Sequence, residues 1–287
     1  MENKITSLSQ YINVVESRYD NYPLHRYLDP TYEMFLFRGV CDHNYTLIPS
    51  IFRKQKDNDY ENYTYISYAS ERNILTSFIV EASGHIDIPL KELFRWAEYA
   101  QHFGVPTRFL DWTSNPLVAL HFACSSKKEK DGVVWLLNFP EYLNIIDPKL
   151  MEYNGTAKND MFSQLLDNTS KIELPFIHLP CYVDARMSAQ SSYFMIWGIK
   201  KVPLEELLSN KCCNIDKLSE DTDNARQDNV LLKAIIPAEN KQKILRELDL
   251  IGINEKSLFP GLDGIGKYIE KKFRLDFSEL EANASYL

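Results

Sequence analysis

The sequence predicts an α+β domain in which helices flank a small mixed or mostly antiparallel sheet. Short, wholly apolar runs that suit strands are separated by longer stretches of helical periodicity. Helices precede the first strand, a helix follows the second strand, and several strands then lead into terminal helices, an order typical of an α+β domain. No linker is long enough or rich enough in proline and glycine to divide the chain, so we expect a single domain over residues 1–287.

Composition and charge are those of an ordinary globular chain. The chain has 287 residues, of which 45% are hydrophobic and 25% are charged, and its formal net charge is −8. This charge argues against a broad phosphate-binding face, although a local basic patch is compatible with it. The sequence contains no apolar run of the roughly 18 residues that a membrane helix needs, so we expect no membrane partner.

Cysteine and histidine usage predicts a reduced, cytoplasmic setting and no metal. The five cysteines form no CxxC pair, and their odd number leaves one unpaired. The N-terminus lacks the apolar segment of a secretory signal. The six histidines are scattered, and none pairs at helical spacing with a carboxylate signature, so we expect no metal site.

The first third of the chain predicts helices around one buried strand. An amphipathic helix is expected within residues 1–33, and a strand over Met34–Phe37 that ends at Arg38-Gly39. Arg38 would then lie at the mouth of the cleft that the strand end borders. Its planar guanidinium group would either bind a phosphate or be held by a carboxylate or by loop carbonyls, and both interpretations remain open. Helices are expected next within residues 63–82 and 89–103.

The chain is organised around residues 101–123, which predict a helix end, a short strand, a polar corner and a new helix. Gly104 suits the left-handed conformation that closes a helix. Pro116 suits the first turn of the next helix, where its missing N–H costs nothing, and Asn115 or Ser114 would be the cap.

The polar corner of this stretch has two interpretations. Thr107–Leu110 fits a brief strand, after which Asp111, Thr113, Ser114 and Asn115 place four hydrogen-bonding side chains within five residues. These side chains either satisfy the free N–H groups of the helix start or form part of a ligand site. A helix start after a strand favours an anion, because it offers N–H donors and a favourable dipole.

Three neighbours of the corner are further candidates for a site. Arg108 and Asp111 lie close to Trp112, and charges are rarely buried without partners, which favours a ligand site. His102 lies at the end of the preceding helix, where it would act as a general base or ligand, or would simply cap or pack that helix.

The second half of the chain predicts several strands and terminal helices. Strands are expected over residues 133–137, 176–180, 193–197 and 230–236, a partly helical excursion over 138–174, and helices over 237–250 and 257–273. Gln190 is a polar residue at a strand entrance, where its amide either binds backbone groups or faces a ligand. Residues 209–229 form a charged insertion. Gly261, Gly264 and Gly266 do not follow a strand, so a dinucleotide or P-loop fingerprint is rejected.

Two motifs resemble those of a known family, the FRG domain. Phe37-Arg38-Gly39 is similar to its signature and Gln101–Ala123 to its central motif, with Leu47–Arg53 and an Arg186-x-x-x-Gln190 run in support. The resemblance extends from about residue 30 to about residue 200. It implies a single FRG domain with its core at 30–200, an N-terminal helical segment at 1–29 and C-terminal strand and helices at 200–287. The family implies no settled biochemical activity.

A more distant resemblance to ADP-ribosyltransferases implies roles for three residues. Arg38 would steady the phosphate or ribose of NAD, Thr113 would support the nicotinamide pocket, and Gln190 stands where that family has a glutamate. A carboxylate stabilises a developing cation by its charge, whereas a glutamine offers only an amide dipole. The chain would therefore bind a nucleotide without transferring ADP-ribose, or use another carboxylate, of which Asp111 is the nearest.

Two functions of different classes follow. The first is binding of NAD or ADP-ribose, with ADP-ribosyltransferase- or NAD-glycohydrolase-like chemistry in which NAD is the substrate. The predicted binding residues are Arg38, Gly39, Arg108, Trp112, Thr113 and Asn115, and the predicted catalytic residues are Gln190, Asp111 and His102. The second is a non-catalytic module in which Arg38, Arg108 and Asp111 form a buried ionic network and surface loops bind a protein or nucleic acid. A role in bacterial stress or phage defence is a third interpretation, on kinship alone.

Overall fold

The structure is a computed structural model, and it describes most of the chain. The described residues are 4–20, 35–53, 70–146, 149–152, 155–180, 185–209, 212–214 and 230–273. The start of the helix predicted from residue 63 and most of the insertion predicted over 209–229 lie outside these ranges.

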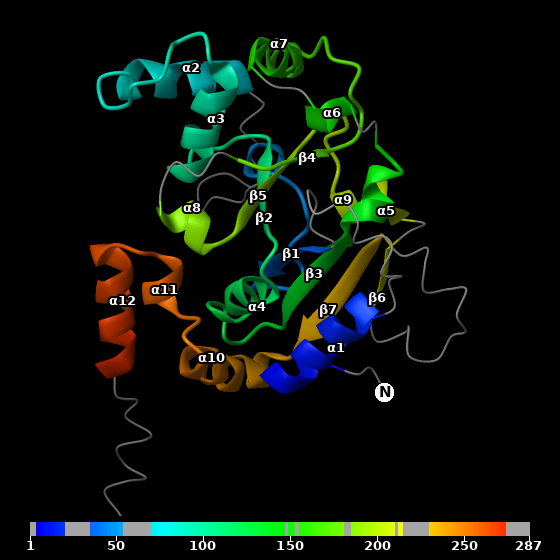
Figure 1. Cartoon of the computed structure of the whole chain (residues 1–287), viewed down its shortest axis with the longest axis vertical. Coiled ribbons are helices and arrows are strands. Elements are labelled where there is room, and N and C mark those ends of the chain that lie inside the picture. The colour runs from blue at the N-terminus through cyan, green and yellow to red at the C-terminus, as the bar shows by residue number, and fades with distance from the viewer. Residues whose placement is uncertain are drawn as a thin grey trace, which may run out of the picture.

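The centre of the fold is a seven-stranded sheet in the order β4-β5-β2-β1-β3-β7-β6 (Figure 1). Its strands are β1 (Phe35–Val40), β2 (Phe109–Thr113), β3 (Gly132–Asn138), β4 (Phe176–His178), β5 (Ser192–Ile196), β6 (Cys212–Asn214) and β7 (Leu231–Ile236). Neighbouring strands are antiparallel, except β6 and β7, which are parallel. The predicted α+β class with a mixed, mostly antiparallel sheet is therefore confirmed.

Helices surround the sheet at both ends and on both faces (Figure 1). The α-helices are α1 (Leu8–Asp20), α2 (Glu71–Ala82), α3 (Leu93–His102), α4 (Pro116–Cys124), α5 (Phe139–Leu143), α6 (Lys149–Glu152), α7 (Gly155–Leu166), α8 (Ala185–Ala189), α9 (Leu204–Leu207), α10 (Lys241–Leu250), α11 (Glu255–Leu258) and α12 (Leu262–Phe273). Short 3₁₀ turns cover Ser50–Phe52 and Ala238–Asn240. Within the described ranges, no helix combines the length and apolarity needed to cross a membrane.

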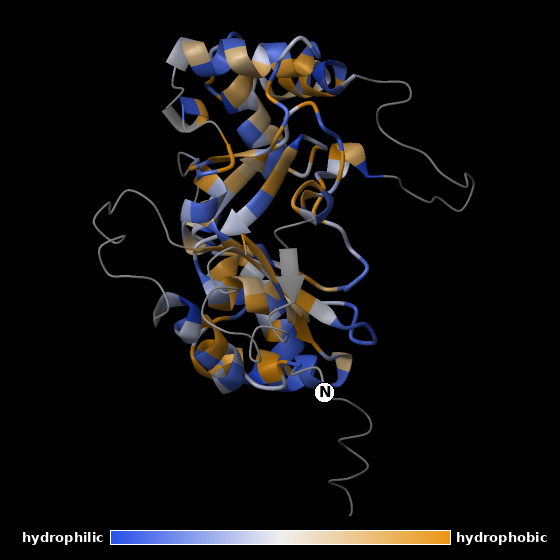
Figure 2. Ribbon diagram, turned by 90° about the vertical axis from the view of Figure 1, so that its right-hand side faces the viewer, coloured by the Kyte–Doolittle hydropathy of each residue, from blue (hydrophilic) through white to orange (hydrophobic). Residues whose placement is uncertain are grey.

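Two hydrophobic cores lie on opposite faces of the sheet. Alternate residues of β3 enter different cores, as the period of two in a strand requires: Trp135 belongs to the core that includes residues of α2, α3 and α7, and Val134 to the core that includes residues of α1, α4 and α10. Figure 2 shows the apolar segments gathered along the sheet and the inner faces of the helices. Helix α1 docks through Tyr11, which is fully buried, whereas the next residue, Ile12, is exposed.

The connection from β2 to β3 places α4 directly over β1. Both strands are antiparallel to β1, which lies between them, so β2 and β3 run in the same direction and α4 must cross the sheet. Gly39 permits the close approach, because a Cβ there would lie 1.8 Å from the carbonyl oxygen of Ala119 and 2.7 Å from the amide nitrogen of Ala123. The glycine of the Phe37-Arg38-Gly39 motif is thus required for packing of the helix on the strand.

Strands β1 and β2 differ from the prediction in their length. Strand β1 continues past Arg38-Gly39 to Val40, and Arg38 pairs with Trp135 of β3 in its interior. Strand β2 continues to Thr113, so Asp111 is a strand residue rather than part of a corner. The two strands pair with each other only at Phe37 and Thr113, which leaves them apart beyond that point.

Candidate functional site

A cavity of about 250 Å³ lies where β1 and β2 separate. Strands β1, β2 and β5 form one side of it. The other side is formed by the end of α3, one flank of α4, and α8 with the residue that follows it. Seven of the nine predicted site residues line this cavity: Arg38, Gly39, His102, Asp111, Trp112, Thr113 and Gln190. Segments about 150 residues apart in the chain therefore meet at one hollow, and the roles of these residues stay predictions.

Arg38 fills part of the gap between β1 and β2. Its Nη1 donates a hydrogen bond to the backbone carbonyl of Asp111, in place of the ladder that the two strands do not form. Its Nη1 also lies 3.9 Å from the Asp111 carboxylate, and its Nε is buried with no acceptor among the described residues. Burial lowers the pKa of Arg38 to about 10, while Asp111 raises it and nearby Arg53 lowers it. Arg38 is therefore still a cation at neutral pH.

Asp111 presents a carboxylate to the cavity from the middle of β2. Its side chain is 56% exposed, whereas its strand neighbours are buried. Both of its carboxylate oxygens accept hydrogen bonds from Nε2 of Gln101, each at 3.1 Å. Gln101, the last residue but one of α3, was not predicted as a site residue.

Thr113 joins β2 to the turn between α8 and β5. Its hydroxyl donates to the backbone carbonyl of Gln190 at 2.6 Å and accepts from the backbone N–H of Asn115 at 3.0 Å. Ser191 in this turn has a φ of 46°, a left-handed conformation that is uncommon for a residue with a side chain. The Thr113 hydroxyl therefore supports the wall of the cavity.

The amide of Gln190 is oriented by the C-terminal part of the chain. Its Nε2 donates to the backbone carbonyl of Leu258 in α11 at 3.1 Å. The NH₂ group of Gln190 therefore binds a backbone group, as one of the two interpretations of this residue expected. The next residue, Phe259, packs edge-on against Phe122 of α4 and also under the guanidinium of Arg186, which lies 4.7 Å from its ring centre. Arg186 is exposed and lines the cavity as a second cation.

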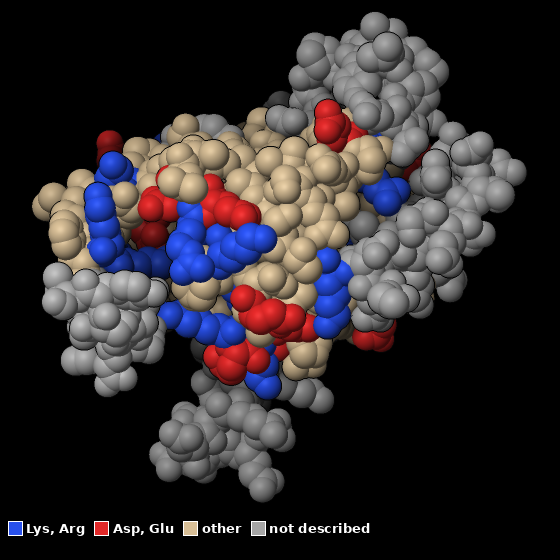
Figure 3. All heavy atoms as spheres, turned by 90° about the horizontal axis from the view of Figure 1, so that it is seen from below, with Lys and Arg blue, Asp and Glu red and all other residues tan. Residues whose placement is uncertain are grey.

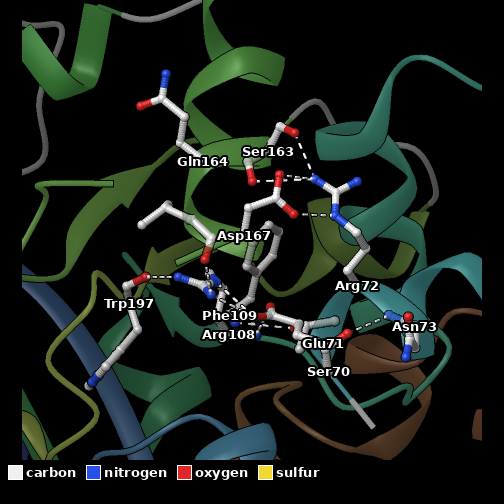
Figure 4. Close-up of polar contacts among 12 residues, drawn as sticks. Ser70, Glu71, Arg72, Asn73, Arg108, Phe109, Ser163, Gln164, Asp167 and Trp197 are labelled. Carbon is white, nitrogen blue, oxygen red and sulfur yellow. Dashed lines mark hydrogen bonds and ion pairs between the residues drawn. The ribbon is translucent and has the colours of Figure 1, made fainter. Parts of the chain in front are cut away.

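Arg108 lies away from the cavity, so the structure does not bring it together with Asp111 as the sequence analysis expected. Figure 4 shows its guanidinium clamped between α2, α7 and the end of β5. Its Nη2 lies 2.7 Å from the carboxylate of Glu71 and donates to the carbonyl of Leu165 at 2.9 Å, and its Nη1 donates to the carbonyl of Trp197 at 3.0 Å. Arg108 and Asp111 are three residues apart in extended chain, so their side chains point to opposite faces. The predicted buried network of Arg38, Arg108 and Asp111 does not form.

Asn115, predicted as a binding residue, is the cap of α4 and does not line the cavity. Its Oδ1 accepts from the backbone N–H groups of Leu117 and Val118 at 2.9 and 3.4 Å. Pro116 occupies the first turn of α4, as predicted. Because its own cap binds two of the free N–H groups, the start of α4 offers fewer donors to an anion.

His102 and Trp112 reach the cavity in different ways. His102 lies at the last position of α3 and packs edge-on against Phe103, with ring centres 5.0 Å apart. Trp112 is 2% exposed and belongs to the larger core, and its Nε1 is buried without an acceptor among the described residues.

The family model of the FRG domain matches residues 33–132. The chain carries an FRG domain. No curated protein and no solved structure matches the chain, so its likeness to ADP-ribosyltransferases stays a prediction. The match includes Arg38, Gly39, Gln101, Asp111 and Thr113 but ends before the later part of the expected core, up to about residue 200.

Three groups that shape the cavity of this FRG domain were missed by sequence reasoning. Gln101 opens the central motif, and its place at the end of a helix, one loop before the strand, was a usable signal. Arg186 belongs to the Arg-x-x-x-Gln run, but no role was given to it. The contact of Leu258 and Phe259 with the cavity wall has no signal in the sequence, because it depends on how α11 packs against α8.

Proposed function

We propose that this FRG domain binds a nucleotide of the NAD or ADP-ribose type in the cavity between β1 and β2. The observation that carries the proposal is the convergence of a mostly buried cation, Arg38, and a solvent-facing carboxylate, Asp111, on one hollow that also has aromatic and aliphatic lining. Small-molecule sites typically combine an apolar lining with a few convergent polar groups. Phe37, Phe122 and Phe194 supply aromatic surface to the same cavity.

Two arginines are suited to the phosphates of such a ligand. Arg38 is charged at neutral pH, and its Nε–H has no hydrogen-bond acceptor among the described residues. Arg186 is exposed at the cavity and its guanidinium is held against the ring of Phe259. A planar guanidinium can donate two parallel hydrogen bonds to phosphate oxygens, whereas the ammonium group of lysine acts as a point charge. Two arginines are therefore well suited to bind phosphates.

The volume of the cavity limits what it can enclose. About 250 Å³ is slightly below the roughly 300–1,000 Å³ of typical small-molecule sites. We therefore assign the enclosed part to one nucleoside half of the ligand, with the remainder at the mouth beside Arg186.

Asp111 is the carboxylate that we propose for NAD-directed chemistry. The bond between ribose C1′ and the nicotinamide nitrogen breaks, and its electron pair leaves with nicotinamide, which becomes neutral. The positive charge that develops on the ribose is stabilised by the Asp111 carboxylate. Water then adds to C1′ and loses a proton to Asp111 or solvent, which gives ADP-ribose. Gln190 would position the turn beside this centre, because its amide nitrogen is already bound to Leu258.

Calorimetry with NAD and ADP-ribose tests the binding proposal. We expect the wild-type protein to bind at least one of them, and Arg38→Gln to bind about 10- to 100-fold more weakly, as loss of a hydrogen bond to a charged group predicts. Arg72→Gln is the matched control, because Arg72 pairs with Asp167 at 2.6 Å on α2 and α7 and does not line the cavity. Absence of binding to both ligands by the wild-type protein would overturn the proposal.

Release of nicotinamide from NAD tests the chemistry separately. We expect Asp111→Asn to lower the rate by about 100-fold or more while ligand affinity changes little, because the isosteric amide removes only the charge. If the wild-type protein binds NAD and releases no nicotinamide, the domain is a binding module and the catalytic half of the proposal fails.

A nucleic-acid partner is not favoured by the face shown in Figure 3. Lysine and arginine side chains alternate there with aspartate and glutamate, and a one-sign patch of the kind that tracks a phosphate backbone does not dominate that view.

A further inference from the structure

A chain of hydrogen bonds leads from the backbone of β2 to the carboxylate of Asp111. The backbone N–H of Phe109 donates to the hydroxyl oxygen of Thr107 at 3.2 Å. The Thr107 hydroxyl lies 2.6 Å from Oε1 of Gln101 and donates to it. Nε2 of Gln101 then donates to both Asp111 oxygens at 3.1 Å.

The direction of each bond in this chain is determined by the groups at its two ends. A carboxylate can only accept, so the NH₂ group of Gln101 faces Asp111 and the carbonyl oxygen of Gln101 faces Thr107. A backbone N–H can only donate, so the Thr107 oxygen accepts from Phe109 and its own proton is free to donate to Gln101. The Thr107 hydroxyl, itself held by the backbone of β2, thus supports this orientation of the Gln101 amide.

We propose that Gln101 is a positioning residue that holds the Asp111 carboxylate in the orientation needed for ligand binding and chemistry. This inference rests on the proposed function for the use of Asp111, but the positioning itself does not. One NH₂ group bonded to both oxygens determines how the carboxylate plane faces the cavity.

The position needs such a partner because Asp111 is otherwise weakly held. Its side chain is more than half exposed, and Nη1 of Arg38 lies 3.9 Å from its nearest oxygen, beyond hydrogen-bond distance. Without Gln101 the carboxylate would be free to rotate toward Arg38 or into solvent. The cation and the carboxylate would then neutralise each other instead of facing separate parts of a ligand.

Side-chain amide NMR tests the positioning without any ligand. We expect a Gln101 Nε2–H resonance of the wild-type protein to be shifted downfield and to exchange slowly. Asp111→Ala removes its acceptor and Thr107→Val removes the group that orients it, so each should move the resonance toward its solvent-exposed value. Thr107→Ser should restore it, because serine keeps the hydroxyl. Identical Gln101 signals in the wild type, Asp111→Ala and Thr107→Val would overturn the inference.

Nucleotide turnover gives the second measurement. We expect Gln101→Leu to lower kcat for nicotinamide release by about 10- to 100-fold with little change in KM, since displacement of a catalytic group affects mainly the chemical step. Gln164→Leu is the matched control, because Gln164 is exposed on α7 and points away from the protein (Figure 4). If Gln101→Leu turns NAD over like the wild type, the positioning role is wrong. If the wild type neither binds nor cleaves NAD, the proposed function fails and the NMR result alone decides the role of Gln101.

Discussion

The carbonyl oxygen of Ala119 lies 1.8 Å from the point that a Cβ on Gly39 would occupy. Helix α4 therefore rests on the bare backbone of β1 at the motif that gives the FRG domain its signature. The obstructing atoms are backbone atoms of Ala119 and Ala123, which cannot move aside as a flexible side chain would.

Gly39→Ala should destabilise the protein because it forces α4 away from β1. We expect a loss of about 3 kcal/mol or more in the free energy of unfolding, at or above the upper end for overpacked cores. Urea denaturation measures it. Gly84→Ala is the matched control, because a Cβ there meets no atom within 4 Å, and its effect should be near zero. Equal stability of Gly39→Ala and wild type would contradict the packing of α4 on β1.

The ion pair of Arg108 and Glu71 should be structural. Both side chains are almost fully buried, at 3% and 9% exposure, so Glu71→Ala leaves an unpaired buried guanidinium. We expect a cost of about 3–5 kcal/mol for that variant. Asp167→Ala, which breaks the exposed pair with Arg72, should cost about 1 kcal/mol or less. Thermal denaturation of the two variants separates these outcomes, and similar melting temperatures would refute the assignment.

Lys241 should stabilise the segments that follow α4 and β1 through its ammonium group. Its side chain is fully buried, and Nζ donates to the carbonyls of Cys41, Ser126 and Lys127 at 2.7, 3.1 and 3.0 Å. Lys241→Met keeps the apolar stem but leaves these carbonyls without a donor, so we expect a loss of about 3 kcal/mol or more, given about 1–3 kcal/mol for each unsatisfied group. Lys243→Met, at an exposed position of the same helix, should change the stability little. A Lys241→Met protein as stable as wild type would show that the carbonyls find other donors.

Acid should destabilise the protein through His178. Burial lowers the pKa of this residue, although its hydrogen bond to Glu98 raises it, and Lys158 on its other ring nitrogen lowers it. The unfolded chain therefore takes up a proton near pH 6.5 that the folded protein binds only at lower pH, so stability falls as the pH drops below about 6.5.

Melting temperatures between pH 7.5 and pH 5.5 measure this effect. His178→Asn should reduce the slope, and an unchanged slope would assign it to another group. Glu255 does not contribute in this window. His121 and Lys271 hold its pKa at about 2, so its stabilisation is complete above about pH 4.5 and is lost only as the pH falls toward 2.

Local chemistry made several elements predictable from the sequence. Gly104 has a φ of 81° at the end of α3, and Asn115 caps α4 with Pro116 in its first turn, because these features depend on residues close in the chain. The convergence of Arg38 and Asp111 on one hollow was expected from the motifs, and both residues line the cavity.

The assignments that needed tertiary information were less successful. Arg38 was expected at the end of its strand, but β1 continues past it to Val40. Its guanidinium lies in the gap between β1 and β2, where it binds the backbone of Asp111. Arg108 was grouped with Asp111 because the strand was expected to end at Leu110. The alternation of side chains between the two faces of the sheet was therefore not applied to this pair. The role of α11 in holding Gln190 depends on packing between segments 68 residues apart, which a local pattern does not encode.

The single residue pair between β1 and β2 divides the sheet into two blocks with continuous strand pairing, β4-β5-β2 and β1-β3-β7-β6. The angle between these blocks is determined by side chains such as Arg38 and by α4, and not by a continuous backbone ladder. Substitutions along this seam will therefore change the width of the opening while each block keeps its own fold.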